Sequence, residues 1–367
     1  MKKLASFAAL LVLAALAAAG CGASAEGDDL AETGKPVHLT VGYQPYYSEA
    51  WSALVLSEKE LWKDYLPEGS TVDFQVGLQG SIIVGQMLAG KEQIGYLGDM
   101  PAIVGASQRD VGDIRIVANV GTSSDQCGVL LVSNDAPEFK SSEEAVQWLD
   151  GKTVATPQGS CADRVAQGVF QQAGVEPGTY LNQTNDLITS DFESGNIDAA
   201  AVWEPNASKL IEDGLARRVA SGEVAGLTTS AFLAMSKDLL DERPDVVEGW
   251  LKAELAAEQY LADPANADEI AQIAVSRTEG FTEQSMHDAL YKKWPATVGG
   301  DPAGVKLSFP FLIDAETEAL VDSASQFLFE VKSLSSPDLP PDALDGTIAK
   351  KVLGTQPSPV GEITATG

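Results

Sequence analysis

Short apolar runs and longer stretches with helical spacing alternate along the first third of the chain. β-branched, aromatic or alternating apolar residues predict strands at 37–43, 72–76, 94–97 and 114–118. Helical spacing predicts helices at 50–63 and 82–89. Strands that alternate with helices indicate a largely parallel sheet with crossover helices, and therefore an α/β fold.

The same order of elements returns between residues 128 and 220. Strands are predicted at 128–133, 153–156, around 181, at 197–203 and at 218–220, and helices at 145–149, 161–173 and 186–194. The units 94–101 and 197–205 resemble each other, and each ends its strand in a loop with a carboxylate, Asp99 or Glu204. Ligands of open α/β sheets bind at this end of the strands. Two similar lobes with a shared cleft are therefore expected.

After Gly226 the pattern changes to one strand followed by helices. The run 229–235 predicts a strand that returns to the first lobe, and amphipathic helices are predicted at 246–261, 265–275, 283–291 and 315–331. The segment from 333 is rich in Pro, Asp and Ser, predicts only a helical patch at 348–352, and is expected to be partly disordered near its end. Two crossing strands would join the lobes. The predicted divisions are lobe 1 at 37–127 and 228–335, lobe 2 at 128–227, and a C-terminal tail at 336–367.

The first residues resemble a secretory signal. Two lysines precede an apolar run too short for a comfortable membrane span, and small residues lead to Cys21. A cysteine in this place resembles the lipobox of bacterial lipoproteins, although Ala18 stands three positions before it instead of the usual Leu. Residues 1–20 are therefore predicted to be a signal peptide, and 21–36 a lipidated Cys21 with a flexible tether. This places the protein outside the cytoplasm, anchored to the bacterial membrane; the alternative is a plain secretory signal with an incidental cysteine.

Two further cysteines, Cys127 and Cys161, lie near the predicted crossing between the lobes. Paired cysteines outside the cytoplasm tend to be oxidised, which favours a disulfide. The alternative is two unpaired buried thiols.

Charge limits the partners. The 367 residues include 53 acidic and 24 basic side chains, a net charge of −29. Such a chain is not expected to bind nucleic acid or an anionic membrane surface, and it repels its own copies, which favours a monomer.

The candidate chemistry is that of a binding site. Helices predicted to begin at Ser81 and Ser160 would direct free N–H groups into the cleft, where they suit a carboxylate, sulfonate or nitrate-like group. Asp99 and Glu204, with Asp125 as a weaker candidate, would hold an amine or hydroxyls. Either carboxylate could instead cap its own helix. Tyr43, Tyr46, Tyr96 and Trp203 could form aromatic walls or, for Tyr43 and Tyr96, pack in the core.

Catalysis has little support in the sequence. The two histidines, His38 and His287, lie far from any carboxylate or cysteine cluster, and no zinc-protease, P-loop, dinucleotide or nucleophile-elbow motif occurs. Ser160 and Cys161 have no evident partner base. No metal-ligand spacing is present. We expect neither enzyme activity nor a metal or cofactor.

Three motifs carry a family resemblance: GYLGDMP at 95–101, GKTVATPQGS at 151–160 and AVWEP at 201–205. Their order and spacing resemble the nitrate/sulfonate/taurine branch of ABC-transporter substrate-binding proteins, over roughly 37–331. The resemblance implies a periplasmic-binding-protein fold that closes on a ligand, and delivery to a membrane permease with an ATPase. The implied ligand loops are 44–46, 79–81, 97–99, 159–161, 203–204 and 228–229.

Two departures bear on the ligand. The taurine and sulfonate members commonly have Gly-Ser where this chain has Gly98-Asp99, and a small residue where it has Glu204. The added negative charge favours a zwitterionic or amine-containing ligand over a simple anion. An enzyme like those of thiamine-pyrimidine synthesis, in the same superfamily, is the alternative, but its cysteine-rich motif and histidine are missing. The predicted ligand-binding residues are Gln44, Tyr46, Gln79, Gly80, Ser81, Leu97, Gly98, Asp99, Asp125, Ser160, Cys161, Trp203, Glu204 and Thr229.

Overall fold

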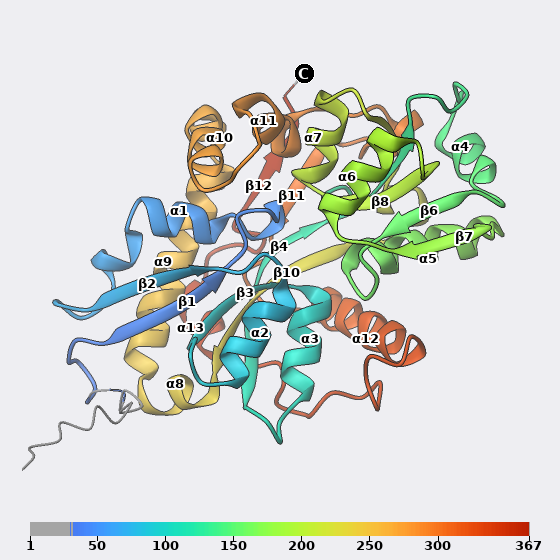
Figure 1. Ribbon diagram of the computed structural model, residues 1–367. Coiled ribbons are helices and arrows are strands. Elements are labelled where there is room, and N and C mark those ends of the chain that lie inside the picture. Colours follow the sequence, from blue (N-terminus) through green and yellow to red (C-terminus); the bar gives the residue numbers. More distant parts are fainter. Residues whose placement is uncertain (1–29, 31, 367) are drawn as a thin grey trace, which may run out of the picture.

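The computed structural model describes residue 30 and residues 32–366, which form two α/β lobes, each built on its own sheet (Figure 1). The predicted two-lobed α/β architecture is confirmed. The predicted signal peptide, Cys21 and most of the predicted tether lie outside the described residues. Within the described residues, no helix has the length and apolar character needed to cross a membrane.

The larger sheet, of lobe 1, has seven strands. Across the sheet they are β12 (Gly361–Thr364), β11 (Val305–Phe309), β4 (Ile114–Ser123), β10 (Thr229–Ser236), β3 (Ile94–Gly98), β1 (His38–Tyr43) and β2 (Thr71–Val76). β1 pairs in parallel with β2 and β3, whereas β10 lies antiparallel between β3 and β4. The sheet is therefore mixed, because the returning strand enters its centre.

Lobe 2 has a five-stranded sheet. Its order is β7 (Thr179–Asn182), β6 (Thr153–Thr156), β8 (Ala199–Trp203), β5 (Cys127–Ser133) and β9 (Ala216–Ala220). Its helices are α4 (Ser142–Trp148), α5 (Cys161–Ala173), α6 (Asn185–Ser194) and α7 (Asn206–Glu212). The chain enters this sheet between Ser123 and Cys127 and leaves it between Ala220 and Thr229.

Helices cover both faces of the lobe 1 sheet. They are α1 (Ser52–Glu58), α2 (Gly80–Leu88), α3 (Asp99–Ser107), α8 (Lys237–Glu242), α9 (Pro244–Ala262), α10 (Ala267–Ser276), α11 (Glu283–Tyr291), α12 (Ala315–Glu330) and α13 (Thr347–Leu353). Neighbouring residues of β3 show the two layers, since Tyr96 packs in the core with α1 and α9, and Leu97 in the core with α2, α3 and α12. Both faces of β3 are buried, which explains its unbroken apolar sequence.

The C-terminal segment corrects the predicted tail. β12 pairs antiparallel with β11 at the edge of the lobe 1 sheet, and α13 packs on α9. β12 has four residues and only Ile363 is buried, so it has too little alternation to be recognised as a strand. The segment is therefore part of lobe 1, not a separate tail.

Residues 294–300, which we call the strap, extend from lobe 1 onto lobe 2. Ser142 Oγ donates a hydrogen bond to the Thr297 carbonyl (3.1 Å), and Ser221 Oγ to that of Gly299 (2.6 Å). Gly299 has a positive φ of 77°, and a Cβ there would lie 2.6 Å from the Ser221 nitrogen. The predicted division placed all of 228–335 in lobe 1, but the strap packs against the other lobe.

A disulfide joins Cys127 and Cys161, as predicted. It links the first residue of β5 to the first residue of α5, across a sequence separation of 34 residues. The start of α5 is thereby fixed to the strand by which the chain enters lobe 2.

Candidate functional site

A cavity of about 700 Å³ lies between the lobes. Lobe 1 lines it with the loop after β1 and the first turns of α2 and α3. Lobe 2 contributes the loop before α5, the loop after β7 and the end of β8. Nine predicted ligand residues are among its lining: Gln44, Gln79, Gly80, Ser81, Gly98, Asp99, Ser160, Cys161 and Trp203.

Helix N-termini from both lobes reach this cavity. Gly80 begins α2, and within the described residues no side-chain cap bonds the first turn of this helix. A Cβ at Gly80 would lie 2.4 Å from the Pro101 side chain, so glycine allows the starts of α2 and α3 to come together. Across the cavity, Ser160 caps α5 by accepting the Asp163 N–H. Unsatisfied N–H groups of a first helical turn attract anions.

Asp99 forms an ion pair that joins the lobes. Its Oδ2 lies 3.0 Å from Nη2 of Arg164 on α5, and its Oδ1 accepts the N–H of Met100 (2.8 Å). The same Arg164 nitrogen donates to the Thr228 carbonyl (2.6 Å). Burial raises the pKa of Asp99 above its usual value, although Arg164 and the Met100 N–H act against this rise. The charge of Asp99 is thus compensated within the protein.

A second carboxyl, which the sequence did not indicate, lies beside this pair. Glu49 is fully buried and accepts hydrogen bonds from the hydroxyl groups of Tyr47 and, at 2.5 Å, Thr229. Burial raises the pKa of Glu49 to about 8, against the lowering effect of these hydrogen bonds. Glu49 is therefore mostly protonated at pH 7 and adds little negative charge near the cavity.

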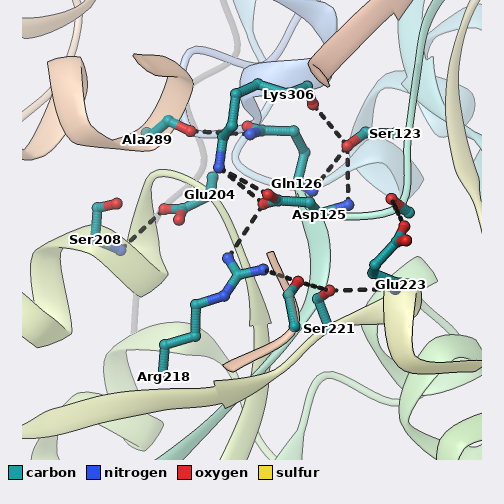
Figure 2. A network of polar contacts seen from close by, with 12 residues as sticks. Ser123, Asp125, Gln126, Glu204, Ser208, Arg218, Ser221, Glu223, Ala289 and Lys306 are labelled. Atoms are coloured by element: carbon teal, nitrogen blue, oxygen red, sulfur yellow. Dashed lines mark hydrogen bonds and ion pairs between the residues drawn. The ribbon is translucent and has the colours of Figure 1, made fainter. Parts of the chain in front are cut away.

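Asp125 and Glu204 belong to a different cluster, shown in Figure 2. Asp125 lies 3.1 Å from Arg218 on β9 and 2.9 Å from Lys306 on β11. Glu204 Oε2 accepts the N–H of Ser208 (2.9 Å) in the first turn of α7. The structure therefore agrees with the alternative interpretation of Glu204 as a helix cap. Burial raises the pKa of Glu204 above its usual value, although nearby Lys306 acts against this rise.

Five predicted ligand residues are not among the cavity lining: Tyr46, Leu97, Asp125, Glu204 and Thr229. Leu97 is buried in β3 because both faces of that strand are covered. Tyr46 contributes its carbonyl to the Trp203 indole N–H (2.9 Å), a contact between the lobes. Tyr43 and Tyr96 are core residues.

The sequence profile of the NMT1-like family matches residues 32–275. The chain belongs to the NMT1-like family. It is 28% identical over 233 residues to the taurine-binding periplasmic protein of Escherichia coli (strain K12), a match that covers 62% of this chain and 68% of that protein. It is also 28% identical over 212 residues to a putative aliphatic sulfonates-binding protein of the same organism, covering 56% of this chain and 61% of that one.

Solved structures share the fold of this NMT1-like protein. The alkanesulfonate-binding protein SsuA from Xanthomonas axonopodis pv. citri, bound to MOPS, gives a TM-score of 0.66 at 20% identity, covering 86% of this chain and 99% of that one. The periplasmic nitrate-binding protein NrtA from Synechocystis PCC 6803 gives a TM-score of 0.67 at 13% identity, covering 89% of this chain and 92% of that one. The related sequences are solute-binding proteins, so the comparisons support a binding protein and not the enzyme alternative.

The site of this NMT1-like protein includes residues that sequence reasoning missed. They are Tyr47, Val84, Leu88, Val104, Asn182, Gln183, Thr184, Leu187 and Leu328 at the cavity, and Glu49 and Arg164 behind it. Asn182 ends β7, so the rule that ligands bind at strand ends could have found it. Arg164 stands inside an amphipathic helix and has no distinguishing sequence signal. Within the described residues, no group of His, Cys, Asp and Glu is suited to a metal ion.

Proposed function

We propose that this protein is the solute-binding component of an ABC importer and captures a small organic anion of the sulfonate class between its lobes. The observation that carries the proposal is the convergence of the α2 and α5 N-termini, from opposite lobes, on one cavity. The taurine and sulfonate specificities of the related proteins support this class. Eight of the nine lining residues of the predicted set are the proposed ligand contacts, and the ninth, Asp99, is buried in its pair with Arg164.

The charges around the cavity favour an anion over an amine. Asp99 is paired with Arg164, Asp125 with two cations, and Glu204 is bonded to its own helix away from the cavity. Of the carboxylates that the sequence predicts in the cleft, Asp99 and Asp125 are therefore compensated by cations, and Glu204 is bonded to its own helix. The N-terminus of α2, whose first turn has neither a side-chain cap nor an acidic residue, remains as the main electrostatic feature facing a ligand, since the first turn of α5 also holds Asp163.

Calorimetric titration tests this assignment. We expect saturable binding of ethanesulfonate and taurine, and none of ethylamine. The variant Gln79→Glu adds a negative charge at the start of α2, where a carboxylate suits the helix dipole and should not destabilise the fold. Because two like charges in close contact repel, its affinity for ethanesulfonate should fall at least about tenfold. Gln171→Glu, on an exposed position of α5 away from the cavity, is the matched control. Binding of ethylamine without either sulfonate would contradict the proposal.

We further propose that Cys21 carries the lipid anchor and that a monomer delivers the ligand to a permease with its ATPase. The signal-like residues before Cys21 support the anchor. In cells, Cys21→Ser should move the protein from the membrane fraction to the soluble fraction; unchanged fractionation would contradict the anchor. Sedimentation of the protein without its first 29 residues should give a single monomeric species.

A further inference from the structure

Glu49 lies one side chain away from the cavity. The hydroxyl of Tyr47 donates a hydrogen bond to Glu49 Oε2, and Tyr47 lines the cavity. The Tyr47 ring packs on Gly98, where a Cβ would lie 3.4 Å from the Tyr47 hydroxyl oxygen. Asp99, the first residue of α3, follows directly. A change of charge at Glu49 therefore acts just behind the surface that a ligand would contact.

The segment that carries Glu49 is held from both lobes. It is the single-turn 3-10 helix η1 (Ser48–Ala50), and the Ser48 N–H donates to the Glu204 carbonyl of lobe 2 (3.1 Å). On the lobe 1 side, a Cβ at Gly121 of β4 would lie 2.4 Å from the Glu49 carbonyl oxygen, so the two backbones are in close contact. The Glu49 side chain is fully buried. Ionisation would therefore leave its charge in the interior of the protein.

The hydrogen-bond geometry around Glu49 fits a protonated carboxyl. The Thr229 hydroxyl has one proton, yet two acceptor oxygens lie within hydrogen-bond distance: Glu49 Oε1 at 2.5 Å and the Ser123 carbonyl at 3.2 Å. In the carboxylate, Thr229 can donate to only one of them. In the neutral acid, Glu49 can donate to Thr229 and Thr229 to Ser123, so that both contacts are hydrogen bonds. Burial raises the pKa of Glu49 to about 8, in agreement with this arrangement.

Two acids and one base meet behind the cavity. The titratable and charged groups that act on Glu49 are Tyr47 of its own segment, Asp99 and, from lobe 2, Arg164; β10 faces it with the neutral Thr229 and β4 with backbone. While Glu49 is neutral, Asp99 and Arg164 form a one-to-one ion pair at 3.0 Å and the group has no net charge. When Glu49 is ionised, one negative charge is left over in the interior, where it is weakly screened.

We propose that Glu49 is a positioning residue that makes the capture of an anion dependent on a proton: anions bind while Glu49 is neutral and are repelled once it is ionised. This inference rests on the proposed function and deepens it, because it adds regulation by pH to the same site. The coupling is reciprocal, so a bound anion also favours the neutral form of Glu49. The protein should therefore take up protons as it binds an anion near pH 8 and lose affinity in alkaline solution.

Calorimetric titration with ethanesulfonate at pH 7 and pH 9.5 tests the coupling, since a sulfonate stays ionised in this range. The dissociation constant should rise at least about fourfold, as for a coupling at the low end of the usual range. At pH 8, Tris and triethanolamine differ in ionisation enthalpy, and titrations in the two buffers should show an uptake of about 0.3–0.5 proton per ligand. Sulfonate buffers are avoided because they would compete for the site.

The outcomes separate this inference from the proposed function. Binding of ethanesulfonate with the same affinity at both pH values and no proton uptake would overturn the role of Glu49 and leave the proposed function standing. Absence of binding at either pH would contradict the proposed function, and the inference with it.

Three variants assign the effect. Glu49→Gln removes the titrating group, so its affinity should be the same at pH 7 and pH 9.5. Glu92→Gln is the matched control, since burial raises the pKa of Glu92 to about 7 but Glu92 does not line the cavity; it should keep the pH dependence of the wild type. Thr229→Val removes a hydrogen bond that lowers the pKa of Glu49 and should move the midpoint of the affinity profile to higher pH, a test that holds even if Glu49→Gln does not fold. An unchanged profile in both Glu49→Gln and Thr229→Val, or a flat one in Glu92→Gln, would refute the assignment.

Discussion

Two carboxylates, Asp99 and Glu204, show how the cavity differs from the site that the sequence predicted. Asp99 belongs to the cavity lining, but its side chain is fully buried and is compensated by Arg164 from the other lobe. Glu204 occupies the corresponding place in the second sequence unit, yet it turns to its own helix and is fully buried. Equivalent positions in two similar units therefore have different roles, because Asp99 pairs with a cation of the other lobe whereas Glu204 bonds to a helix of its own lobe.

Glu204 is predicted to act on stability. Glu204→Ala removes the acceptor for the Ser208 N–H and should lower the free energy of unfolding by about 1–3 kcal/mol. Glu204→Gln keeps an acceptor for this N–H, so its free energy of unfolding should fall by less than that of Glu204→Ala. Urea unfolding of the two variants measures the difference. A loss of ligand affinity at unchanged stability would instead show that Glu204 contacts the ligand.

The sequence identified local features of the site but not its long-range pairs. Gln79–Ser81 and Ser160 could be found because glycine turns and helix-start residues are local signals. Arg164 is 65 positions away from Asp99, and Glu49 is 180 away from Thr229. Neither partner can be recognised until the fold brings them together.

Among the helices, α9 contains two buried glutamic acid side chains. Glu254 and Glu258 are fully buried, and in the part of the chain that the structure describes no Lys or Arg pairs with either. Glu254 accepts the Tyr96 hydroxyl at 2.5 Å. Burial raises the pKa of Glu254 to about 7, and burial together with Glu254 raises that of Glu258. These acids favour the protonated form in the folded state.

Stability should therefore fall as the pH rises. The pKa values of Glu254 and Glu92 are about 7 and that of Glu49 about 8, whereas an unfolded glutamic acid has a pKa near 4.3. Between the unfolded and the folded pKa values, the folded state binds more protons than the unfolded state. The free energy of unfolding therefore decreases from about pH 5 to pH 8. Calorimetric melting temperatures between pH 5 and pH 9 measure the slope.

Two α9 variants test the origin of this slope. Glu254→Gln should make it shallower, because the residue no longer titrates. Glu248→Gln should leave the slope unchanged, since hydrogen bonds from Lys252 and Lys351 lower the pKa of Glu248 to about 2, outside the range. A flat profile in the wild type would contradict the assignment of neutral buried acids.

Long apolar elements were predictable, and short ones at the sheet edge were not. β5 and β10 are buried along almost their whole length, so their composition alone predicts strands. β11 and β12 are short, and the pairing between them at the sheet edge gives them their structure. β4 is twice as long as the predicted run 114–118, since its polar second half pairs with β10.

At the scale of the whole molecule, a buried charge cluster connects the lobes (Figure 2). Lys306 comes from lobe 1, Arg218 from lobe 2, and Asp125 from the crossing between them. Arg218 also donates to the Val298 and Gly299 carbonyls of the strap (3.1 and 2.8 Å). The lobes are therefore joined by polar contacts as well as by the two chain crossings.

Removing Lys306 should weaken the whole molecule. Lys306→Met leaves Asp125 with Arg218 but removes the cation that lies near the buried Glu204, so the free energy of unfolding should fall by about 3–5 kcal/mol. Lys350→Met, at an exposed position of α13, should change it little. Urea unfolding of both variants gives the comparison. A loss below about 1 kcal/mol for Lys306→Met, far under the usual cost of breaking a buried pair, would show that the cluster does not stabilise the fold.

The pairing of β12 at the sheet edge affects the order in which the two lobes can fold during synthesis. The larger sheet takes β1 to β4 from the beginning of the chain and β10 to β12 from its end. While the ribosome is still making the polypeptide, only the smaller, uninterrupted lobe has all its strands. The larger one waits for Gly361–Thr364, which follows every other strand of that sheet along the chain. A nascent chain that lacks this strand cannot complete its larger sheet, so the smaller lobe is expected to fold first.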